Sequence, residues 1–340
     1  MSVVLVTGGA GYVGSHAVKA LAASGRDVTV VDNLSAGHGE AVARLARAFP
    51  ARRVELVEAD TADRARLLDV MQRVKPAAVL HFAAWLSVPD SVRDPAGYYR
   101  NNVIGTLTLL DAMVTAGVRR LVFSSTCAVF GEPKVVPLDE SHPRSPINAY
   151  GETKLAIERA LPHFDTAYGL KSVALRYFNA SGADPEGVLG EDHDPEIHLI
   201  PRAIIAATGG EPLHVFGDDY PTPDGTCQRD YVHVSDLADA HLLALSRLES
   251  GAGSSVYNLG NGAAVSVREV IDAVERVSSR KVPFVMAARR AGDPARLVAS
   301  SARAHSELGW RPRLAALDDI VGTAWRWHSA NPRGYGGAAR

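Results

Sequence analysis

Short apolar runs, rich in β-branched residues, alternate with longer helical stretches along the first half of the chain. Each run suits a buried strand, and the stretches between the runs are long enough for crossover helices, as in Pro95–Ala116. Apolar strands that alternate with helices are typical of a parallel sheet covered on both faces. The predicted strands are Val3–Val6, Val28–Val31, Val54–Val57, Ala77–Leu80, Leu121–Phe123 and Val173–Leu175.

The pattern changes after about Asn179, where glycine and proline become frequent. Right-handed crossovers give residues 1–178 a Rossmann-like, doubly wound α/β fold. Residues 179–330 are predicted to form mainly a smaller, discontinuous α/β substrate lobe, with about 232–250 packing back onto the first domain, and 331–340 a frayed polar tail. The later strands are predicted at Leu213–Phe216, Val256–Leu259 and Val282–Val285, and the later helices at Ile200–Ala207, Val234–Leu248, Val267–Val277 and Leu317–His328.

Composition and charge argue against several classes of protein. Apolar residues make up 46% of the 340 positions and charged residues 22%, an ordinary globular composition. A net charge of −2 gives no footprint for nucleic acid, and no apolar run is long enough to span a bilayer. Two cysteines, Cys127 and Cys227, are not expected to form a disulfide framework or a four-ligand zinc site. Because the chain enters a strand without a basic leader, we expect no signal peptide and a cytoplasmic location.

A glycine-rich turn follows the first predicted strand and precedes an apolar helix. Its spacing, Gly-x-x-Gly-x-x-Gly, is one residue longer in the first gap than the usual dinucleotide fingerprint. Glycine allows the tight turn and the close approach of backbone N–H groups to a pyrophosphate at a helix N-terminus. The alternative is a turn needed only for packing, but the strand–turn–helix context favours a cofactor. The candidate cofactor-binding residues here are Gly8, Gly11, Tyr12, Val13 and Gly14.

A carboxylate at the end of the second strand indicates which dinucleotide is bound. Asp32 can accept hydrogen bonds from the ribose hydroxyls of adenosine, and it would repel a 2′-phosphate. Asn33 and the residues that follow include no Arg or Lys up to His38, so NAD is favoured over NADP. After the third strand, Asp60 and Thr61 are candidates for the adenine side of the site. A helix N-cap is an open alternative for Asp60.

A tyrosine and a lysine four residues apart provide the candidate chemistry. Tyr150 and Lys154 share one face of a predicted helix. A nearby cation favours the phenolate, and lowering the pKa of tyrosine to about 7 requires about 4 kcal/mol. Strand five leads into Ser124-Ser125-Thr126 at the carboxyl end of the sheet, where ligands of such folds bind. Together with the glycine turn, Thr126, Tyr150 and Lys154 form a catalytic constellation.

Across nearly its whole length the sequence resembles the extended short-chain dehydrogenases, and among them the UDP-glucose (UDP-galactose) 4-epimerases. The second-lobe motifs are the more specific ones, because they separate this branch from its relatives. The matching segments are 7–16, 32–34, 81–84, 101–103, 150–154, 175–179, 216–222, 224–226, 229–234 and 289–293.

The resemblance implies a role for each matching residue. Tyr150 would be the acid/base on the sugar 4-hydroxyl, Thr126 would bind that oxygen, and Lys154 would hold the nicotinamide ribose and depress the pKa of Tyr150. The NAD site would be lined further by Phe82, Ala83, Asn101 or Asn102, and Tyr177. The UDP-sugar would be held by Asn179, Leu199, Arg229, Tyr231, Arg290 and Asp293, with Phe216 against the uracil or in the core. His81 and His233 are interpreted as core histidines, and no metal site is expected.

The implied reaction is the reversible, NAD-dependent 4-epimerisation of UDP-glucose and UDP-galactose through a 4-keto intermediate, as in galactose metabolism. NAD would be regenerated in each turnover and stay bound, and the family implies a homodimer. Dehydratases are disfavoured because Cys127 and Ala128, rather than an acidic pair, follow Thr126. A UDP-glucuronate decarboxylase, a 4-epimerase of UDP-GlcNAc/GalNAc or of a UDP-pentose, and more distantly a non-catalytic NAD-binding scaffold stay open.

Three positions depart from the family pattern. Leu86 stands where some epimerases have a lysine near the cofactor, and Phe130 replaces a common tyrosine. Leu297 stands where some epimerases have a tyrosine that restricts the sugar pocket. We therefore expect partial acceptance of N-acetylated sugars.

Overall fold

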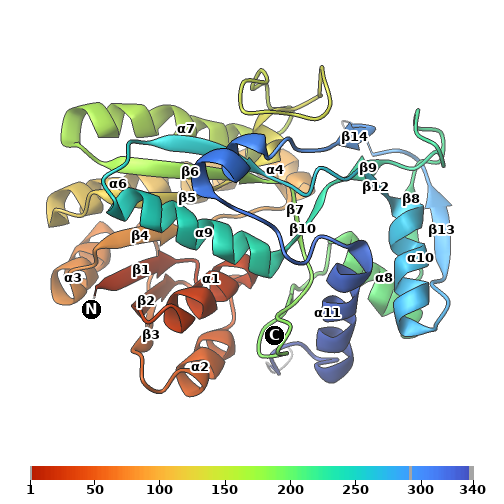
Figure 1. Cartoon of the computed structure of the whole chain (residues 1–340), viewed down its shortest axis with the longest axis horizontal. Helices are drawn as coiled ribbons and strands as arrows, with labels where there is room; N and C mark the ends of the chain where they lie inside the picture. The colour runs from red at the N-terminus through yellow and green to blue at the C-terminus, as the bar shows by residue number, and fades with distance from the viewer. Residues whose placement is uncertain (1, 291–292, 337–340) are drawn as a thin grey trace.

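The computed structural model describes residues 2–290 and 293–336 (Figure 1). Residues 337–340 of the predicted polar tail lie outside the described part. The beginning of that tail is packed rather than frayed. Tyr335 is 7% exposed because its large ring packs against Trp327, and its hydroxyl donates to the carbonyl of Gly190 at 3.1 Å.

A seven-stranded parallel sheet forms the centre of the molecule, in the order β11-β6-β5-β4-β1-β2-β3. The six strands predicted in the first half are all present, and the doubly wound α/β prediction is confirmed. The last strand, β11, was expected in the second lobe but pairs with β6 instead. The strands are β1 (Val3–Thr7), β2 (Asp27–Asp32), β3 (Val54–Glu58), β4 (Ala78–His81), β5 (Arg120–Thr126), β6 (Lys171–Tyr177) and β11 (Ser255–Leu259).

Helices cover both faces of this sheet and bury separate apolar clusters. One face packs under α1 (Tyr12–Ala23), α2 (Gly39–Ala48) and α9 (Val234–Glu249). The other packs under α3 (Arg64–Val74), α6 (Gly105–Ala116) and α7 (Ala149–Tyr168). The predicted crossover helix at 95–116 is present in three consecutive pieces, α5 (Pro95–Tyr98), the π-helical segment η1 (Tyr99–Ile104) and α6.

The second lobe has its own core and lies at the carboxyl end of the sheet strands (Figure 1). Its helices are present where the pattern predicts them, and β13 begins two residues later than predicted. Among the described residues, no helix is both long and apolar enough to cross a membrane. The lobe contains α8 (Leu199–Ala207), α10 (Val267–Ser278), α11 (Leu317–Ala330), β8 (Leu213–Phe216) and β13 (Phe284–Ala287), and the small strands β7 (Asn179–Ser181), β9 (Gln228–Arg229), β10 (Tyr231–His233), β12 (Val265–Ser266) and β14 (Arg296–Leu297).

The chain returns to the first domain after it has entered the lobe. Helix α9 packs against α1 and under β5 and β6, and β11 then completes the sheet. The remaining short elements are α4 (Val88–Arg93), η2 (Cys127–Val129) and η3 (Ala304–Leu308). Since the strands are parallel, the ends of β1, β2, β4, β5 and β6 all face the second lobe, and this edge contains the predicted site.

Candidate active site

The turn between β1 and α1 tolerates only glycine at two positions. Gly8 has φ +73°, and a Cβ there would lie 2.4 Å from the backbone nitrogen of Ala83. A Cβ on Gly14 would lie 2.1 Å from the carbonyl oxygen of Gly8. Real Cβ atoms do not approach backbone so closely, so a side chain at either position would open the turn. Gly11 is the N-cap of α1 in extended backbone, with room for a Cβ.

The N-terminus of α1 fits a diphosphate. Its N-cap provides no side-chain hydrogen bond, and its first turn has no acidic residue, so the N–H groups that include those of Val13 and Gly14 have no side-chain cap. Tyr12 closes one side of the turn by donating its hydroxyl to the carbonyl of Gly182 at 2.7 Å. A helix end of this kind attracts an anion through its free N–H groups and its dipole.

Asp32 lies beside this turn, 8% exposed. Burial raises the pKa of its carboxyl, and hydrogen bonds from the backbone N–H groups of Leu34 (2.9 Å) and Ala10 (3.0 Å) oppose the rise. These contacts hold the carboxylate at the end of β2, where the ribose of a dinucleotide would lie. Asn33 follows, and its amide donates to Asp60 at 2.8 Å.

Asp60 is not a helix N-cap. It accepts from the backbone N–H of Ala62 at 2.7 Å, in a local turn before the helix. The N-cap of α3 is Asp63, which accepts from the backbone N–H of Arg66 at 2.9 Å. The capping alternative for Asp60 is therefore wrong, and its contact with Asn33 joins the loops after β2 and β3. Thr61 beside it is 9% exposed.

Tyr150 lies in the first turn of α7 with the hydroxyl of Thr126 close enough to lower its pKa. Burial is the larger influence and raises that pKa well above its ordinary value, with Tyr177 adding to the rise. The expected depression is thus absent from the protein alone, because desolvation disfavours the phenolate. Only a charge supplied in the complex can reverse it.

Lys154 is 4% exposed and points at the end of β5. Its Nζ donates to the carbonyl of Ser124 at 2.9 Å and lies 5.0 Å from the ring centre of Phe123. Burial lowers the pKa of the ammonium to about 7, and Glu158 opposes that shift. Lys154 therefore lies with the candidate residues at the end of β5. In the protein without ligands its ammonium donates to a backbone carbonyl.

A buried ion pair lies one helical turn beyond Lys154. Glu158 accepts three hydrogen bonds from Arg176 of β6, at 2.6, 2.9 and 3.2 Å, with both side chains about 2% exposed or less. Its Oε1 also accepts from the hydroxyl of Ser125 at 2.6 Å. The pair thus ties α7 to both β5 and β6 directly behind the catalytic residues.

His241 of α9 is a site residue that the sequence analysis missed. Its ring lies 4.6 Å, centre to centre, from that of Phe82, and its Nε2 lies 3.4 Å from Oγ of Ser124. Tyr177 contacts the same Ser124 hydroxyl at 3.0 Å. Burial lowers the pKa of His241 to about 4, so the imidazole is neutral. No local sequence signal marks it, because its partners lie more than a hundred positions away.

The two asparagines of η1 have different roles. Asn102 is 2% exposed and joins the loop after β4 to α7, through Trp85 and the hydroxyl of Thr153 (3.1 Å). Asn101 donates to the side chain of Asn102 at 2.9 Å and is less buried. Asn102 is thus committed to structure, which leaves Asn101 as the candidate for cofactor contact.

Arg229 and Asp293 form an ion pair in the second lobe. The guanidinium also donates to the carbonyls of Gln228 (2.8 Å) and Pro294 (2.9 Å). Burial lowers its pKa, but Asp293, Cys227 and Tyr231 together raise it, and the net shift is upward. Leu297 of β14 pairs in register with Arg229 and packs in the apolar cluster that includes Cys127. This cluster connects the lobe to the end of β5.

The other predicted substrate residues line the same lobe at different depths. Arg290 lies 3.8 Å above the ring centre of Phe216, a cation–π contact. Asn179 of β7 pairs with Tyr231 of β10, which is 8% exposed and belongs to the lobe core. Leu199 is the first residue of α8.

The predictions for two histidines are confirmed. His81 contacts the hydroxyls of Thr7 (2.6 Å) and Thr106 (2.8 Å). His233 contacts Thr323 at 3.0 Å and accepts from the backbone N–H of Ser235. Burial lowers the pKa of both histidines to about 3, so they are neutral core residues.

Two departures from the family pattern occupy different environments. Phe130 is 1% exposed and lies 5.2 Å from the guanidinium of Arg176, in an apolar setting that needs no hydroxyl. Leu86 is 42% exposed in the loop after β4.

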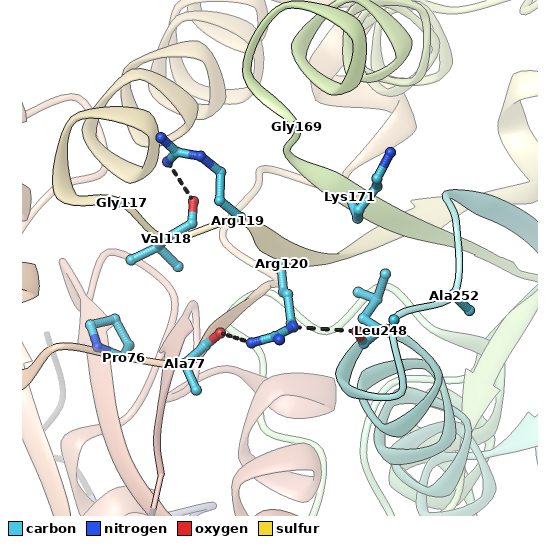
Figure 2. Close-up of a pocket in the computed structure, with 11 residues that line it drawn as sticks. Pro76, Ala77, Gly117, Val118, Arg119, Arg120, Gly169, Lys171, Leu248 and Ala252 are labelled. Atoms are coloured by element: carbon cyan, nitrogen blue, oxygen red, sulfur yellow. Dashed lines mark hydrogen bonds between the residues drawn. The ribbon is translucent and has the colours of Figure 1, made fainter.

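A surface hollow of about 360 Å³ lies at the opposite, amino edge of the sheet (Figure 2). Three cationic side chains surround the hollow. Figure 2 shows that two of them donate hydrogen bonds to backbone carbonyls. Arg119 donates to Val114 (3.0 Å) at the end of α6, and Arg120 to Leu248 (3.3 Å) in α9. Lys171 pairs with Asp165. The hollow is therefore separate from the site at the carboxyl edge.

Residues 4–260 match the model of the NAD dependent epimerase/dehydratase family. The chain belongs to this family. One member, the UDP-glucose 4-epimerase of Rhizobium meliloti (strain 1021), is 51% identical over 97% of this chain and 98% of that protein. The solved UDP-glucose 4-epimerase of Brucella ovis in complex with NAD is 50% identical, covers 96% of this chain and 98% of its own, and has a TM-score of 0.91. The Bifidobacterium longum enzyme in complex with NAD+ and UDP is 38% identical, with 98% and 100% covered and a TM-score of 0.93.

The comparisons confirm the predicted family, its Rossmann-like fold and its use of NAD. They also support the prediction of an isomerase that acts on a UDP-hexose. The glycine turn, the uncapped start of α1 and Asp32 fit the dinucleotide on geometry alone.

Proposed function

We propose that the protein catalyses the reversible 4-epimerisation of UDP-glucose and UDP-galactose with tightly held NAD, as a step of galactose metabolism. The observation that carries the proposal is the meeting of Thr126, Tyr150 and Lys154 at the carboxyl edge of the sheet. The second lobe faces that edge. The charge of its Arg229 opposes the rise that burial causes in the pKa of Cys127, so Arg229 lies near Cys127, the residue after Thr126. An acid/base pair therefore lies next to a cationic lobe suited to a nucleoside diphosphate.

The cofactor residues divide by the part of NAD that they would contact. Gly8, Gly11, Tyr12, Val13 and Gly14 would hold the pyrophosphate, and Asp32 and Asn33 the adenosine ribose, with Asp60 and Thr61 beside the adenine. Phe82, Ala83, Asn101 and Tyr177 would line the nicotinamide side. His241, which is neutral and packs against Phe82 with its ring tilted, would support that wall from behind.

The substrate residues would hold UDP and leave the hexose at the catalytic end. Arg229 and Arg290 would neutralise the diphosphate, with Asp293 fixing Arg229 in place. The remaining contacts would come from Asn179, Leu199, Phe216, Tyr231 and Leu297. The uracil would compete with Arg290 for the face of Phe216.

In this mechanism Tyr150 takes the proton of the 4-hydroxyl and later returns it to the oxygen of the 4-keto sugar, so that the hydroxyl is restored when hydride returns to the other face of C4. Thr126 donates or accepts at the same oxygen and keeps it beside the phenol. Bound NAD+ would supply reversible hydride transfer to and from C4 of the hexose, and the positive charge that the buried phenol lacks in the protein alone. Lys154 would hold the nicotinamide ribose through its ammonium. The 4-keto sugar must turn between the removal of hydride from C4 and its return. The second lobe must therefore hold the substrate by its UDP part rather than by the hexose ring.

The proposed function can be tested with purified protein offered UDP-Gal, UDP-GalNAc and UDP-glucuronate without added NAD. We expect epimerised UDP-Gal, which would support both the substrate and the retained cofactor. Tyr150→Phe is expected to lose about 10²–10⁴-fold in kcat while it retains NAD. Tyr168→Phe, at an exposed position at the end of the same helix, is the matched control and should behave as wild type.

Two results would contradict the proposed function. Release of CO₂ from UDP-glucuronate would instead identify a decarboxylase. Turnover that is equal in Tyr150→Phe and in wild type would remove Tyr150 from the chemistry, and NAD binding without turnover of any UDP-sugar would indicate a scaffold.

We also propose a homodimer, supported by apolar side chains that η1 and α6 expose to solvent. Tyr99, Ile104 and Leu107 are 43%, 53% and 37% exposed. An apolar helix face of this kind suits the helix pair of an isologous dimer. The free cysteines Cys127 and Cys227 fit the proposed cytoplasmic location. Light scattering of the purified protein would test the dimer, and a monomeric mass at micromolar concentration would contradict it.

A further inference from the structure

Four side chains between β7 and α8 converge on one point at the border of the candidate active site, next to Tyr12 and Leu199. Glu191, His193, Glu196 and His198 each offer one ligand atom, and these atoms all lie within 4.8 Å of one another. From this convergence we propose a structural site for one divalent transition-metal ion of the Zn²⁺ type. The proposal replaces the earlier expectation that the protein has no metal site.

Two of the separations between ligand atoms, both from His193, are close to those of a tetrahedral site. Nδ1 of His193 lies 3.2 Å from Oε1 of Glu191 and 3.7 Å from Oε2 of Glu196. Nδ1 of His198 lies 3.7 Å from Oε1 of Glu196 and also contacts Glu191. In a tetrahedron with bonds of about 2.0–2.1 Å to Zn²⁺, ligand atoms are about 3.3–3.4 Å apart. Small side-chain shifts would therefore place an ion between the four atoms.

One of these atoms makes no hydrogen bond within the described residues. Nδ1 of His193 is buried and has no hydrogen-bond partner among the described residues, although a carboxylate oxygen is within 3.2 Å. A buried nitrogen without a partner is costly in free energy. A metal ion would satisfy it through the nitrogen lone pair, at the point where the carboxylates already face it.

The carboxylate of Glu196 is oriented by contacts of its own, as outer-shell groups orient metal ligands. Oε1 of Glu196 accepts from the backbone N–H groups of Ile197 and His198, both at 2.8 Å, which leaves Oε2 turned toward His193. The side chain of Glu191 is only 3% exposed, and its backbone carbonyl accepts from the indole of Trp327 at 3.0 Å.

Two imidazoles and two carboxylates suit the borderline divalent ions and disfavour Mg²⁺ and Ca²⁺, which prefer oxygen alone. Four protein ligands close the coordination shell, so the ion would have a structural role and no open position for catalysis. The segment lies between the two lobes. His193 packs edge-on against Tyr12 of α1, with ring centres 6.2 Å apart, while Trp327 belongs to α11. The ion would thus fasten the loop that leads into α8 against the start of α1.

The experiment measures metal binding directly and is independent of epimerisation. Full-length protein is stripped with a chelator, titrated with Zn²⁺ by calorimetry, and reconstituted with Co²⁺ for its visible absorption. We expect one ion per chain, a tetrahedral Co²⁺ spectrum and a higher Tm with Zn²⁺. His193→Gln and Glu196→Gln should weaken Zn²⁺ binding by roughly 100-fold or more, since even outer-shell partners change affinity by 10–100-fold.

His163→Gln, at an exposed histidine of α7, is the matched control and should bind as wild type. Glu196→Gln retains the acceptor for Ile197 and His198, so it should fold even if His193→Gln does not. Failure of the wild-type protein to bind one Zn²⁺ per chain would overturn the proposal and leave an ion-pair cluster. Binding of equal strength in folded His193→Gln or Glu196→Gln would overturn it too.

Discussion

Glu158 on the catalytic helix and Arg176 on the neighbouring strand form an ion pair that is almost fully removed from solvent. Glu158 follows Lys154 by four positions, so the pair supports the same helix face that presents the lysine. It also binds Ser125, one residue before Thr126. The position of the acid/base residues is therefore coupled to a salt bridge that lies behind them, away from the substrate.

Replacing one member of this pair should destabilise the protein strongly. In Glu158→Gln the guanidinium of Arg176 loses its counter-charge while it stays buried, which costs about 3–5 kcal/mol. We expect a fall in the free energy of unfolding by denaturant. The double variant Glu158→Leu with Arg176→Met should recover much of the loss, because no buried charge is left unpaired; Arg144, which also contacts Glu158, is 42% exposed. The coupling would be contradicted if the double variant lost as much free energy of unfolding as the two single variants together.

Lys154 should limit stability at neutral pH. Its pKa is lowered to about 7 in the folded protein from an ordinary value of 10.5, so between these values the unfolded chain binds the extra proton. Stability therefore rises with pH across that window, and the cost of burying the ammonium is complete below about pH 7. Lys154→Met should abolish turnover yet raise the Tm of the cofactor-free protein at pH 7. The gain should shrink toward pH 10, and a constant gain would argue against this origin.

Arg229 should matter for substrate affinity rather than for NAD. Lysine retains the charge but cannot bind Asp293 and two carbonyls while also facing a diphosphate. Arg229→Lys is expected to raise KM for UDP-Gal at least tenfold, roughly 1.4 kcal/mol, with bound NAD unchanged. Steady-state kinetics and the NAD content of the purified variant provide the two measurements. Loss of NAD from the variant would place Arg229 elsewhere in the site.

Leu297 should set the tolerance for N-acetylated sugars. It lies beside Arg229 in register and packs in the cluster with Cys127, close to the end of β5. A tyrosine there would fill the space that an acetamido group needs, so Leu297→Tyr should lower kcat/KM for UDP-GalNAc about tenfold or more. UDP-Gal turnover should change little, and Leu297→Ala should retain UDP-GalNAc activity. If wild type fails to epimerise UDP-GalNAc at a detectable rate, the hypothesis is wrong.

Local patterns predicted the parallel sheet because strands buried on both faces are mostly apolar, as β1 and β2 are. The same reasoning could not place β11, since a short apolar run does not specify the strand beside it. His241 was missed for a related reason, because it enters the site through the packing of α9. The pKa of Tyr150 depends on desolvation, and spacing along a helix carries no information about that.

The return of β11 to the central sheet makes the two lobes inseparable as pieces of chain. A fragment ending at residue 178 would leave β6 as an open sheet edge and strip α9 from one face. Limited proteolysis within the second lobe would therefore unravel the dinucleotide fold as well. A chimera that exchanges sugar specificity with a relative should therefore exchange only short loops. Replacing the whole second lobe would also replace α9 and β11, which pack in the core of the first domain.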